Sequence, residues 1–593
     1  MSELETGKII INEFGIGFLN TPDKSIYISK QNLNRAYNGE LVQVEIINQE
    51  EGKYYGKVIN FSLIDRIFVG QVHHIYKDEI FVCSKKLTKS NLIVIKLNKS
   101  INKNDWVKVK VVSDINNKIN GELIKLINNN VDTIIEETFN LTLINKISDI
   151  SNNIASDISN NITSDISNNI TSDISNNITS DISNNIASDI SNNIASDRRD
   201  LTHLYTFTID PKSCRDCDDA FSIEYINNQI HIYVHISDVA HYINPMIPEF
   251  DEIIKRGTTI YGSSRNWTMI PELYSNNICS ILPNKETYVY TNEFIFLEET
   301  NTIEYVDSYY SVIKSSTKFS YEDIYHDAFI FDTLNKTAKI IQFEMKELNL
   351  TEPSESHDMV KFWMIKVNQI MSEKIQKIYR CHNKPYDNQF VLLQNYLEYK
   401  QLPVSNERDS LYNLLSNEEN DLLSNNNNDL LSNNKNNILY FIIKTILPKA
   451  YYSSTDNSHY GLGINNYTHW TSPIRRGCDL LNHCILKGYD IDIVKYIDYL
   501  NDSEKLQYQV EKFMVEHSID FDKIYDGTII SISKTGIVLY VHDLDTKYTI
   551  HVSKLSNERL IFENNVLSNE KQIYKLYDTL HVKINNNFEF TII

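Results

Sequence analysis

An eight-residue repeat separates this chain into two parts. Residues 150–197 read ISNNIASD or ISNNITSD six times, and isoleucine recurs every four residues. That spacing drifts around a helix instead of forming a stripe, and asparagine, serine and aspartate favour turns over helix interiors. We expect a linker over 131–199 whose repeat is a disordered or weakly helical spacer, with an ordered element as the alternative. As a flexible coil of about 48 residues it would span roughly 35–40 Å.

The rest of the chain divides by its hydrophobic pattern. The full length of 593 residues suggests three to five domains. Short apolar runs separated by turn residues predict two small β-barrels over 1–66 and 67–130, and a third over 521–593. Mixed helix and strand patterns over 200–520 predict an α/β domain. Its tract 415–437, LSNEENDLLSNNNNDLLSNNKNN, is typical of a surface insertion.

The barrels have two interpretations. They are either any pair of small β domains or OB-type barrels, a fold that often binds single-stranded nucleic acid. In the second case Phe14, Phe18 and Tyr27 are candidate residues for base stacking.

Charge and cysteine content exclude some classes of protein. The chain has 57 Lys+Arg and 78 Asp+Glu, so its formal charge is −21. That balance argues against non-specific coating of nucleic acid or anionic membranes, but not against a local basic channel. Seven cysteines, an odd and sparse number, argue against a disulfide framework and favour a reducing compartment. We see neither a signal peptide nor an apolar run long enough to span a membrane.

The segment TFTIDPKSCRDCDDAFS carries the strongest chemical signal. It places Asp210, Asp216, Asp218 and Asp219 within ten residues. Four carboxylates so close repel one another unless a positive charge lies among them, and clustered oxygen ligands suit magnesium or manganese. Two such ions can activate a water and stabilise the leaving oxygen of a phosphodiester. The alternative is a solvated acidic loop.

Two further patterns have both a functional and a structural interpretation. Cys214 and Cys217 form a CxxC pair, but no second CxxC completes a zinc knuckle, so we expect packing residues. In YTHWTSPIRRGCD, Arg475 and Arg476 are adjacent, and a planar guanidinium matches phosphate oxygens. The alternative for the arginines is a helix start with both side chains in solvent.

Six segments together resemble, in order, the RNase II/RNase R family, which shares the RNB catalytic domain and includes the catalytic exosome subunit. They are TIDPKSCRDCDDA, VHISDVAHYI, RGTTIY, MIPELYSNNICSI, IKSSTKFSYEDI and HYGLGINNYTHWTSPIRR. RAYNGELVQVEI resembles part of the family's first barrel. The resemblance covers nearly the whole chain apart from the two low-complexity tracts.

The resemblance implies an α/β RNB domain flanked by two N-terminal cold-shock-type barrels and a C-terminal OB module. It implies processive 3′→5′ hydrolysis of single-stranded RNA to nucleoside 5′-monophosphates. The four aspartates would hold magnesium, or manganese, and Arg475 would clamp the scissile phosphate. Tyr261 would stack on the 3′-terminal base, Tyr321 would contact its sugar, and Arg476 is a further candidate for substrate binding.

The chain departs from the family pattern at three positions. Lys361 and Phe362 stand where a pair of glutamates is usual, and Gly477 replaces an aromatic residue. These departures leave open a catalytically silent RNA-binding protein on the same scaffold, and a scaffold protein carrying the octad array is a third alternative. We expect no endonuclease domain ahead of the first barrel. We also expect a monomer that binds single-stranded RNA, not membranes, in the cytoplasm, which would be the host cytoplasm if the source is a virus.

Overall fold

The computed structural model falls into two compact units, one of residues 1–142 with 262–265 and one of 143–261 with 266–593. The octad repeat, the tract 415–437 and Phe14 lie outside the described residues, so the expectations for them stay predictions. The structure describes residues 4–11, 16–21, 24–34, 36–37, 39–50, 53–61, 66–84, 92–96, 100–115, 118–143, 198–345, 355–401, 408–410, 438–556, 559–563, 566–585 and 590–593.

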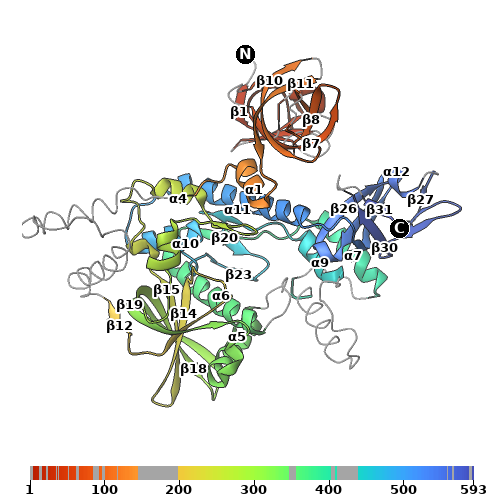
Figure 1. Ribbon diagram of the computed structural model, residues 1–593. Coiled ribbons are helices and arrows are strands. Elements are labelled where there is room, and N and C mark those ends of the chain that lie inside the picture. The colour runs from red at the N-terminus through yellow and green to blue at the C-terminus, as the bar shows by residue number, and fades with distance from the viewer. Residues whose placement is uncertain are drawn as a thin grey trace, which may run out of the picture. The chain divides into compact units, whose positions relative to one another are not determined.

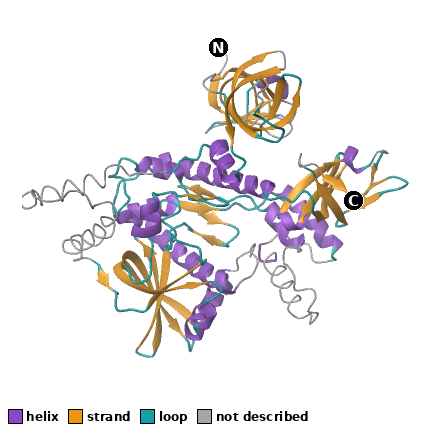
Figure 2. Cartoon of the chain, viewed as in Figure 1, coloured by secondary structure: helices purple, strands orange, loops and turns teal. Residues whose placement is uncertain are grey.

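The first unit consists almost entirely of strands (Figure 2). Its alternating sequence puts one face of each strand inside: in β10, Val107 and Val109 are buried while Lys110 is exposed. The first sheet has the order β1-β5-β6-β4-β3-β2, and the second closes as a barrel in the order β10-β11-β9-β8-β7. The bounds are β1 (Leu4–Lys8), β2 (Ile10–Ile11), β3 (Gly17–Asn20), β4 (Ser25–Ile28), β5 (Leu41–Glu50), β6 (Lys53–Phe61), β7 (Ile67–Tyr76), β8 (Glu79–Cys83), β9 (Ile93–Lys96), β10 (Trp106–Ile115), β11 (Lys118–Ile127) and the helix α1 (Val131–Phe139).

The second unit is built on a six-stranded sheet of order β12-β19-β13-β14-β15-β18. Strand β19 is 19 residues long and pairs with β18 along its first part and with β13 along its last part, so the sheet closes on itself. Its bounds are β12 (Arg199–Asp200), β13 (Thr206–Asp210), β14 (Asp219–Ile226), β15 (Gln229–Ser237), β18 (Glu286–Leu297) and β19 (Thr302–Ser320).

Helices α5 and α6 lie along this sheet (Figure 1) and supply its main hydrophobic core. Trp363 of α6 is fully buried against Phe294 of β18, with ring centroids 5.0 Å apart. A second core joins α4, α10 and α11. The bounds are α4 (Phe250–Arg256), α5 (Ala328–Met345), α6 (Glu355–Ile375), α7 (Phe390–Tyr399), α9 (Ile438–Ile446), α10 (Gly477–Leu486) and α11 (Ile493–His517). Three short strand pairs complete this part of the chain: β16 (Ile260–Tyr261) with β17 (Asn266–Trp267), β20 (Tyr379–Cys381) with β21 (Tyr451–Ser453), and β22 (Ser458–His459) with β23 (Ile464–Asn465).

The C-terminal part of the second unit is again rich in strands, and the OB-type fold class predicted from the sequence is confirmed. A five-stranded sheet has the order β26-β25-β24-β30-β31, beside a three-stranded sheet β27-β28-β29. None of the described helices has the length and apolar character required to cross a membrane. The bounds are β24 (Ile524–Ser533), β25 (Gly536–Val541), β26 (Thr546–His551), α12 (Val552–Leu555), β27 (Ile561–Glu563), β28 (Val566–Ser568), β29 (Ile573–Lys575), β30 (Thr579–Ile584) and β31 (Phe590–Ile592).

Candidate active site

The sheet gathers the predicted site residues at one edge. Strands β13 and β19 run parallel, with Asp210 opposite Ser320 at their carboxyl ends, so Tyr321 follows at the same edge. Strand β14 is antiparallel to β13 and begins there, at Asp219. The loop between β13 and β14 carries Asp216 and Asp218. The four carboxylates therefore converge because a strand end, a loop and a strand start meet at this edge.

Asp218 lies at the centre of this arrangement. Its side chain is 1% exposed, and its two oxygens accept hydrogen bonds from the backbone N–H of Ile474, at 2.8 Å, and from Nε of Arg475, at 2.9 Å. The Arg475 side chain itself stays 45% exposed. The guanidinium is thus held at Nε by Asp218 and at Nη2 by Oγ of Ser472, to which it donates at 3.2 Å, while the side chain as a whole stays half exposed.

The pKa values of these carboxylates show that the site disfavours their charged forms. Burial, together with repulsion from Asp216, raises the pKa of Asp218 to about 7 despite its pair with Arg475. Burial also raises the pKa of Asp210, and it raises that of Asp219 further, with repulsion from Asp210 and Asp218 adding to the effect. Such carboxylates ionise readily only when a positive charge joins them.

The cluster fits a divalent cation. Oδ2 of Asp210 is buried and has no hydrogen-bond partner among the described residues. An unpaired buried oxygen of this kind is costly unless a ligand satisfies it. Magnesium and manganese favour carboxylate oxygens, and a bound cation would reverse the raised pKa values of Asp210 and Asp219. These two residues are therefore the best candidates for metal ligands, since Asp218 is engaged by Arg475.

Two tyrosines flank the cluster. The hydroxyl of Tyr261, in β16, donates to Oδ2 of Asp216 at 3.1 Å, and its ring is 39% exposed. The ring of Tyr321 stacks on His357 with centroids 3.7 Å apart, and its hydroxyl is close enough to Asp219 and Asp210 that burial and these charges raise its pKa. Both rings are thus held beside the carboxylates.

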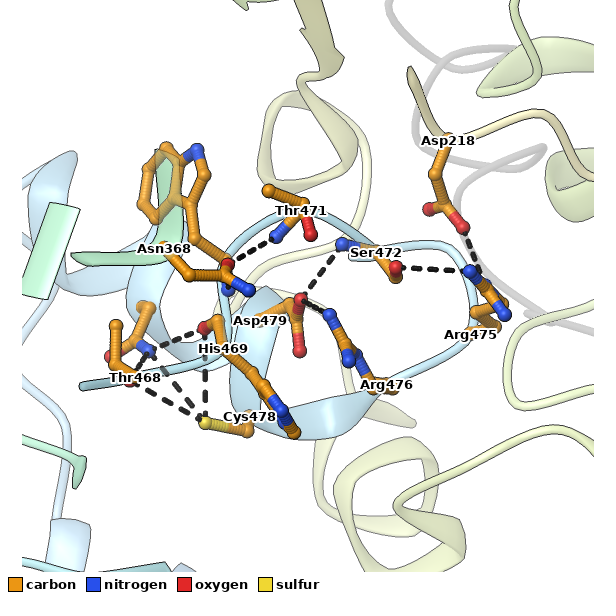
Figure 3. A network of polar contacts seen from close by, with 12 residues as sticks. Asp218, Asn368, Thr468, His469, Thr471, Ser472, Arg475, Arg476, Cys478 and Asp479 are labelled. Atoms are coloured by element: carbon orange, nitrogen blue, oxygen red, sulfur yellow. Dashed lines mark hydrogen bonds and ion pairs between the residues drawn. The ribbon is translucent and has the colours of Figure 1, made fainter. Parts of the chain in front are cut away.

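A buried network holds the segment that carries Arg475 (Figure 3). Oδ1 of Asp479 accepts from the backbone N–H of Ser472 and from Nη2 of Arg476, both at 2.7 Å. Arg476 therefore braces the loop through Asp479, whereas the sequence alone suggests it as a substrate ligand; that role stays a prediction.

Asn368 of α6 secures the other end of this loop. Its Oδ1 accepts from the backbone N–H of Trp470, at 2.8 Å, and of Thr471, at 3.2 Å, while its Nδ2 donates to the hydroxyl of Tyr467 at 3.0 Å. The sequence analysis missed Asn368, although it lies in the same helix segment as Lys361 and Phe362. Its only signal was a lone asparagine in an otherwise apolar stretch of helix.

The glycine after Arg476 has a packing reason. The N–H of Gly477 donates to the carbonyl of Gly257 at 2.7 Å. A Cβ at position 477 would lie 3.2 Å from the Gly257 backbone and 3.0 Å from Leu500. The backbone of Thr259 also donates to the carbonyl of Arg475 at 3.0 Å. This close approach ties the Arg475 loop to the segment that leads into Tyr261.

The other departures from the family pattern lie away from the carboxylates' hydrogen bonds. Phe362 is 1% exposed and packs in the core of the sheet, and Lys361 pairs with Asp358 one helical turn away at 2.9 Å. Because these positions carry lysine and phenylalanine, neither supplies the carboxylate that is usual in the family.

Comparisons with known proteins identify the central domain and the fold. Residues 198–327 and 326–490 match the model of the RNB domain. The chain contains an RNB domain. The fold is similar to that of Mycoplasma genitalium RNase R in complex with ribose-methylated single-stranded RNA, with a TM-score of 0.73 and 20% identity over 99% of this chain and 100% of that one. It is also similar to yeast Ssd1, a pseudonuclease, with a TM-score of 0.63 and 15% identity over 92% and 79% of the two chains.

Among curated relatives, Ribonuclease R of Aquifex aeolicus is 24% identical over 426 residues, which cover 62% of this chain and 59% of that protein. The chain thus matches less than two thirds of that RNB-family relative's length.

Proposed function

We propose that this chain is a metal-dependent 3′→5′ exoribonuclease that hydrolyses single-stranded RNA to nucleoside 5′-monophosphates. The observation that carries the proposal is the meeting of Asp210 and Asp219 at one edge of the sheet, with Oδ2 of Asp210 buried and lacking a hydrogen-bond partner among the described residues, beside the half-exposed guanidinium of Arg475. A nuclease needs this combination, because a metal-activated water and a cation on the phosphate act on the same phosphorus.

The carboxylates of Asp210, Asp219, Asp216 and Asp218 are the proposed ligands for magnesium or manganese, with Asp218 also orienting Arg475. Bound there, the metal would activate water and neutralise charge on the phosphate. The exposed part of the Arg475 guanidinium would meet the scissile phosphate, since a guanidinium fork matches phosphate oxygens. Tyr261 would stack on the terminal base and Tyr321 would contact its ribose.

The strand-rich ends are proposed to bind the rest of the RNA, as two barrels over 1–66 and 67–130 and one over 521–593, around an RNB domain over 200–520. The first sheet supports this role. It has a surface pocket of about 360 Å³ whose lining includes Tyr27, Tyr55 and Asn32. Aromatic rings at such a pocket suit base stacking, which is worth ~1–3 kcal/mol per base. We further propose that the protein acts as a monomer in the cytoplasm.

A catalytically silent RNA-binding protein is the second candidate. The similarity to Ssd1 favours it, since that relative is a pseudonuclease on a comparable fold. Against it stand the four aspartates and Arg475, which lie at one edge of the sheet, where Arg475 pairs with Asp218.

The two candidates separate in one assay. Purified protein is incubated with 5′-labelled single-stranded RNA in magnesium or in EDTA, with Asp219→Asn as the matched inactive control. We expect the label to shorten progressively from the 3′ end only in magnesium, with release of nucleoside 5′-monophosphates. Binding without shortening would instead establish the silent protein, and early release of the labelled nucleotide would overturn the 3′→5′ direction.

A further inference from the structure

Two cysteines lie inside the acidic cluster, where the sequence predicts packing residues. Sγ of Cys214 lies 3.6 Å from Oδ1 of Asp210 and 3.5 Å from Oδ1 of Asp216. One ligand atom from each of Asp210, Cys214 and Cys217 lies within 4.8 Å of the other two. The CxxC pair therefore has the third ligand that its sequence spacing alone does not reveal.

We propose that Asp210, Cys214 and Cys217 form a site for a thiophilic divalent cation such as Zn²⁺, and that its occupation withdraws Asp210 from the magnesium cluster. Tetrahedral zinc, with bonds of about 2.3 Å to sulfur and about 2.1 Å to oxygen, holds its ligand atoms roughly 3.4–3.8 Å apart. Small side-chain rotations would bring the three ligand atoms to that separation. Asp216, already in contact with Cys214, is placed to be the fourth ligand.

Both cysteines are held in place by contacts outside their loop. Cys217 is fully buried in a small core with Ala220 and Val289, and its backbone N–H donates to Oγ of Ser280 at 3.0 Å. The carbonyl of Cys214 accepts a hydrogen bond from the ammonium group of Lys318. The two sulfur atoms are thus positioned before any metal arrives, which lowers the cost of binding.

The site differs from the magnesium cluster in ligand softness. Thiolate ligands select zinc and related ions, whereas magnesium requires oxygen ligands. The two kinds of cation would therefore differ in their use of the thiols and share Asp210 and Asp216. Because one carboxylate cannot serve both geometries, each cation weakens the binding of the other, and this coupling is reciprocal.

Cation binding can be tested without any nuclease activity. The full-length protein, stripped of metal, is titrated with Cd²⁺ while thiolate-to-metal absorption is recorded in the ultraviolet. We expect one strong site in the wild type and in Cys83→Ser, which removes a cysteine elsewhere. Loss of an outer-shell partner alone costs about 10–100-fold in metal affinity. Cys214→Ser and Cys217→Ala should therefore weaken the site by at least about tenfold. An unchanged titration in these two variants overturns the proposal.

The inhibitory effect rests on the proposed function and has its own assay. Zn²⁺ is added to magnesium-supported RNA hydrolysis, and the ratio of rates with and without zinc is compared between wild type and Cys214→Ser, so that changes in the basal rate cancel. We expect the wild type to be inhibited at zinc concentrations that the variant tolerates. Equal inhibition would mean that zinc acts on the carboxylates without the thiols, which overturns the regulatory part. If Cys217→Ala does not fold, Cys214→Ser, altered at a half-buried position, decides both assays.

Discussion

Nε of Arg475 lies 2.9 Å from Oδ2 of Asp218, so a half-exposed guanidinium is anchored by a carboxylate that is almost completely buried. The two residues are 257 positions apart in the sequence. Their contact joins the acidic loop after β13 to the loop before α10. It also gives the four aspartates two tasks, since Asp218 orients the arginine while Asp210 and Asp219 remain available for a cation.

Replacement of Asp218 by asparagine tests this division. The amide can still accept from the N–H of Ile474, but its Nδ2 then faces Nε of Arg475, donor against donor. We expect the single-turnover rate at saturating RNA to fall about 10²–10³-fold, as when a positioned electrostatic contact is removed from an active site. RNA affinity should stay within a few-fold. Rapid-quench kinetics and filter binding measure the two quantities.

The matched control for this change is Asp307→Asn. Asp307 pairs with Arg199 at 2.8 Å, but both side chains are about half exposed, and exposed pairs contribute little. Its rate should equal that of the wild type. A wild-type rate in Asp218→Asn would show that Arg475 needs no anchor or takes no part in hydrolysis.

Replacement of Arg475 by lysine should be nearly as damaging as replacement by alanine. A lysine keeps the positive charge but has one ammonium group, which cannot hold Asp218 and meet two phosphate oxygens at the same time. We expect both variants to lose at least about 10²-fold in the rate of hydrolysis. Arg199→Lys, at the exposed pair with Asp307, is the control and should be unaffected. A near-normal rate for Arg475→Lys would mean that Arg475 contributes only its positive charge and not the geometry of its guanidinium.

The raised pKa of Asp218 predicts how stability depends on pH in the absence of metal. Its folded value of about 7 lies above the ordinary aspartate value of about 3.9. The folded chain therefore binds more protons than the unfolded chain between these values, so this group's stabilising contribution is present at pH 4 and is lost as pH rises through about 7. Asp210 and Asp219, whose pKa values are also raised, act in the same direction.

We therefore expect the melting temperature in EDTA to fall between pH 5.5 and pH 8, and magnesium to oppose that fall because the cation replaces the protons. Scanning calorimetry of the wild type and of Asp218→Asn, with and without magnesium, measures both effects. The asparagine variant should show a shallower pH dependence. A melting temperature that rises over this range in the metal-free wild type would contradict the assignment.

The sequence predicts which residues make up the site better than it predicts which of their side chains pair with one another. TFTIDPKSCRDCDDAFS indicates a carboxylate cluster because four charges so close need a cation, and the strand pattern of TFTID places Asp210 at a strand end. The partner of each side chain is a different matter. The pairing of Asp218 with Arg475 depends on how two distant loops meet. Arg476 and Asp479, by contrast, are three residues apart and pair across the first turn of α10. For Cys214 and Cys217 the sequence predicts packing residues because no second CxxC is present. The contact of Cys214 with Asp210 depends on how the loop after β13 folds.

Asn368 provides the last test, because it acts on the site without touching the carboxylates. It is 3% exposed and holds the backbone of Trp470 and Thr471, a few residues before Arg475. Asn368→Leu keeps the approximate shape but leaves the buried N–H groups of Trp470 and Thr471 without this acceptor, at about 1–3 kcal/mol for each group. We expect a lower free energy of unfolding and, at a temperature where the variant is folded, a slower hydrolysis of bound RNA with little change in affinity.

Asn368→Asp keeps an acceptor for both N–H groups, and Tyr467 can donate to it, so the rate should be largely restored even though a buried charge lowers stability. Urea unfolding and single-turnover kinetics separate the two effects, with Gln369→Leu on the same helix as the control. If the leucine variant, once folded, hydrolyses RNA at the wild-type rate, the position of Arg475 does not depend on this anchor.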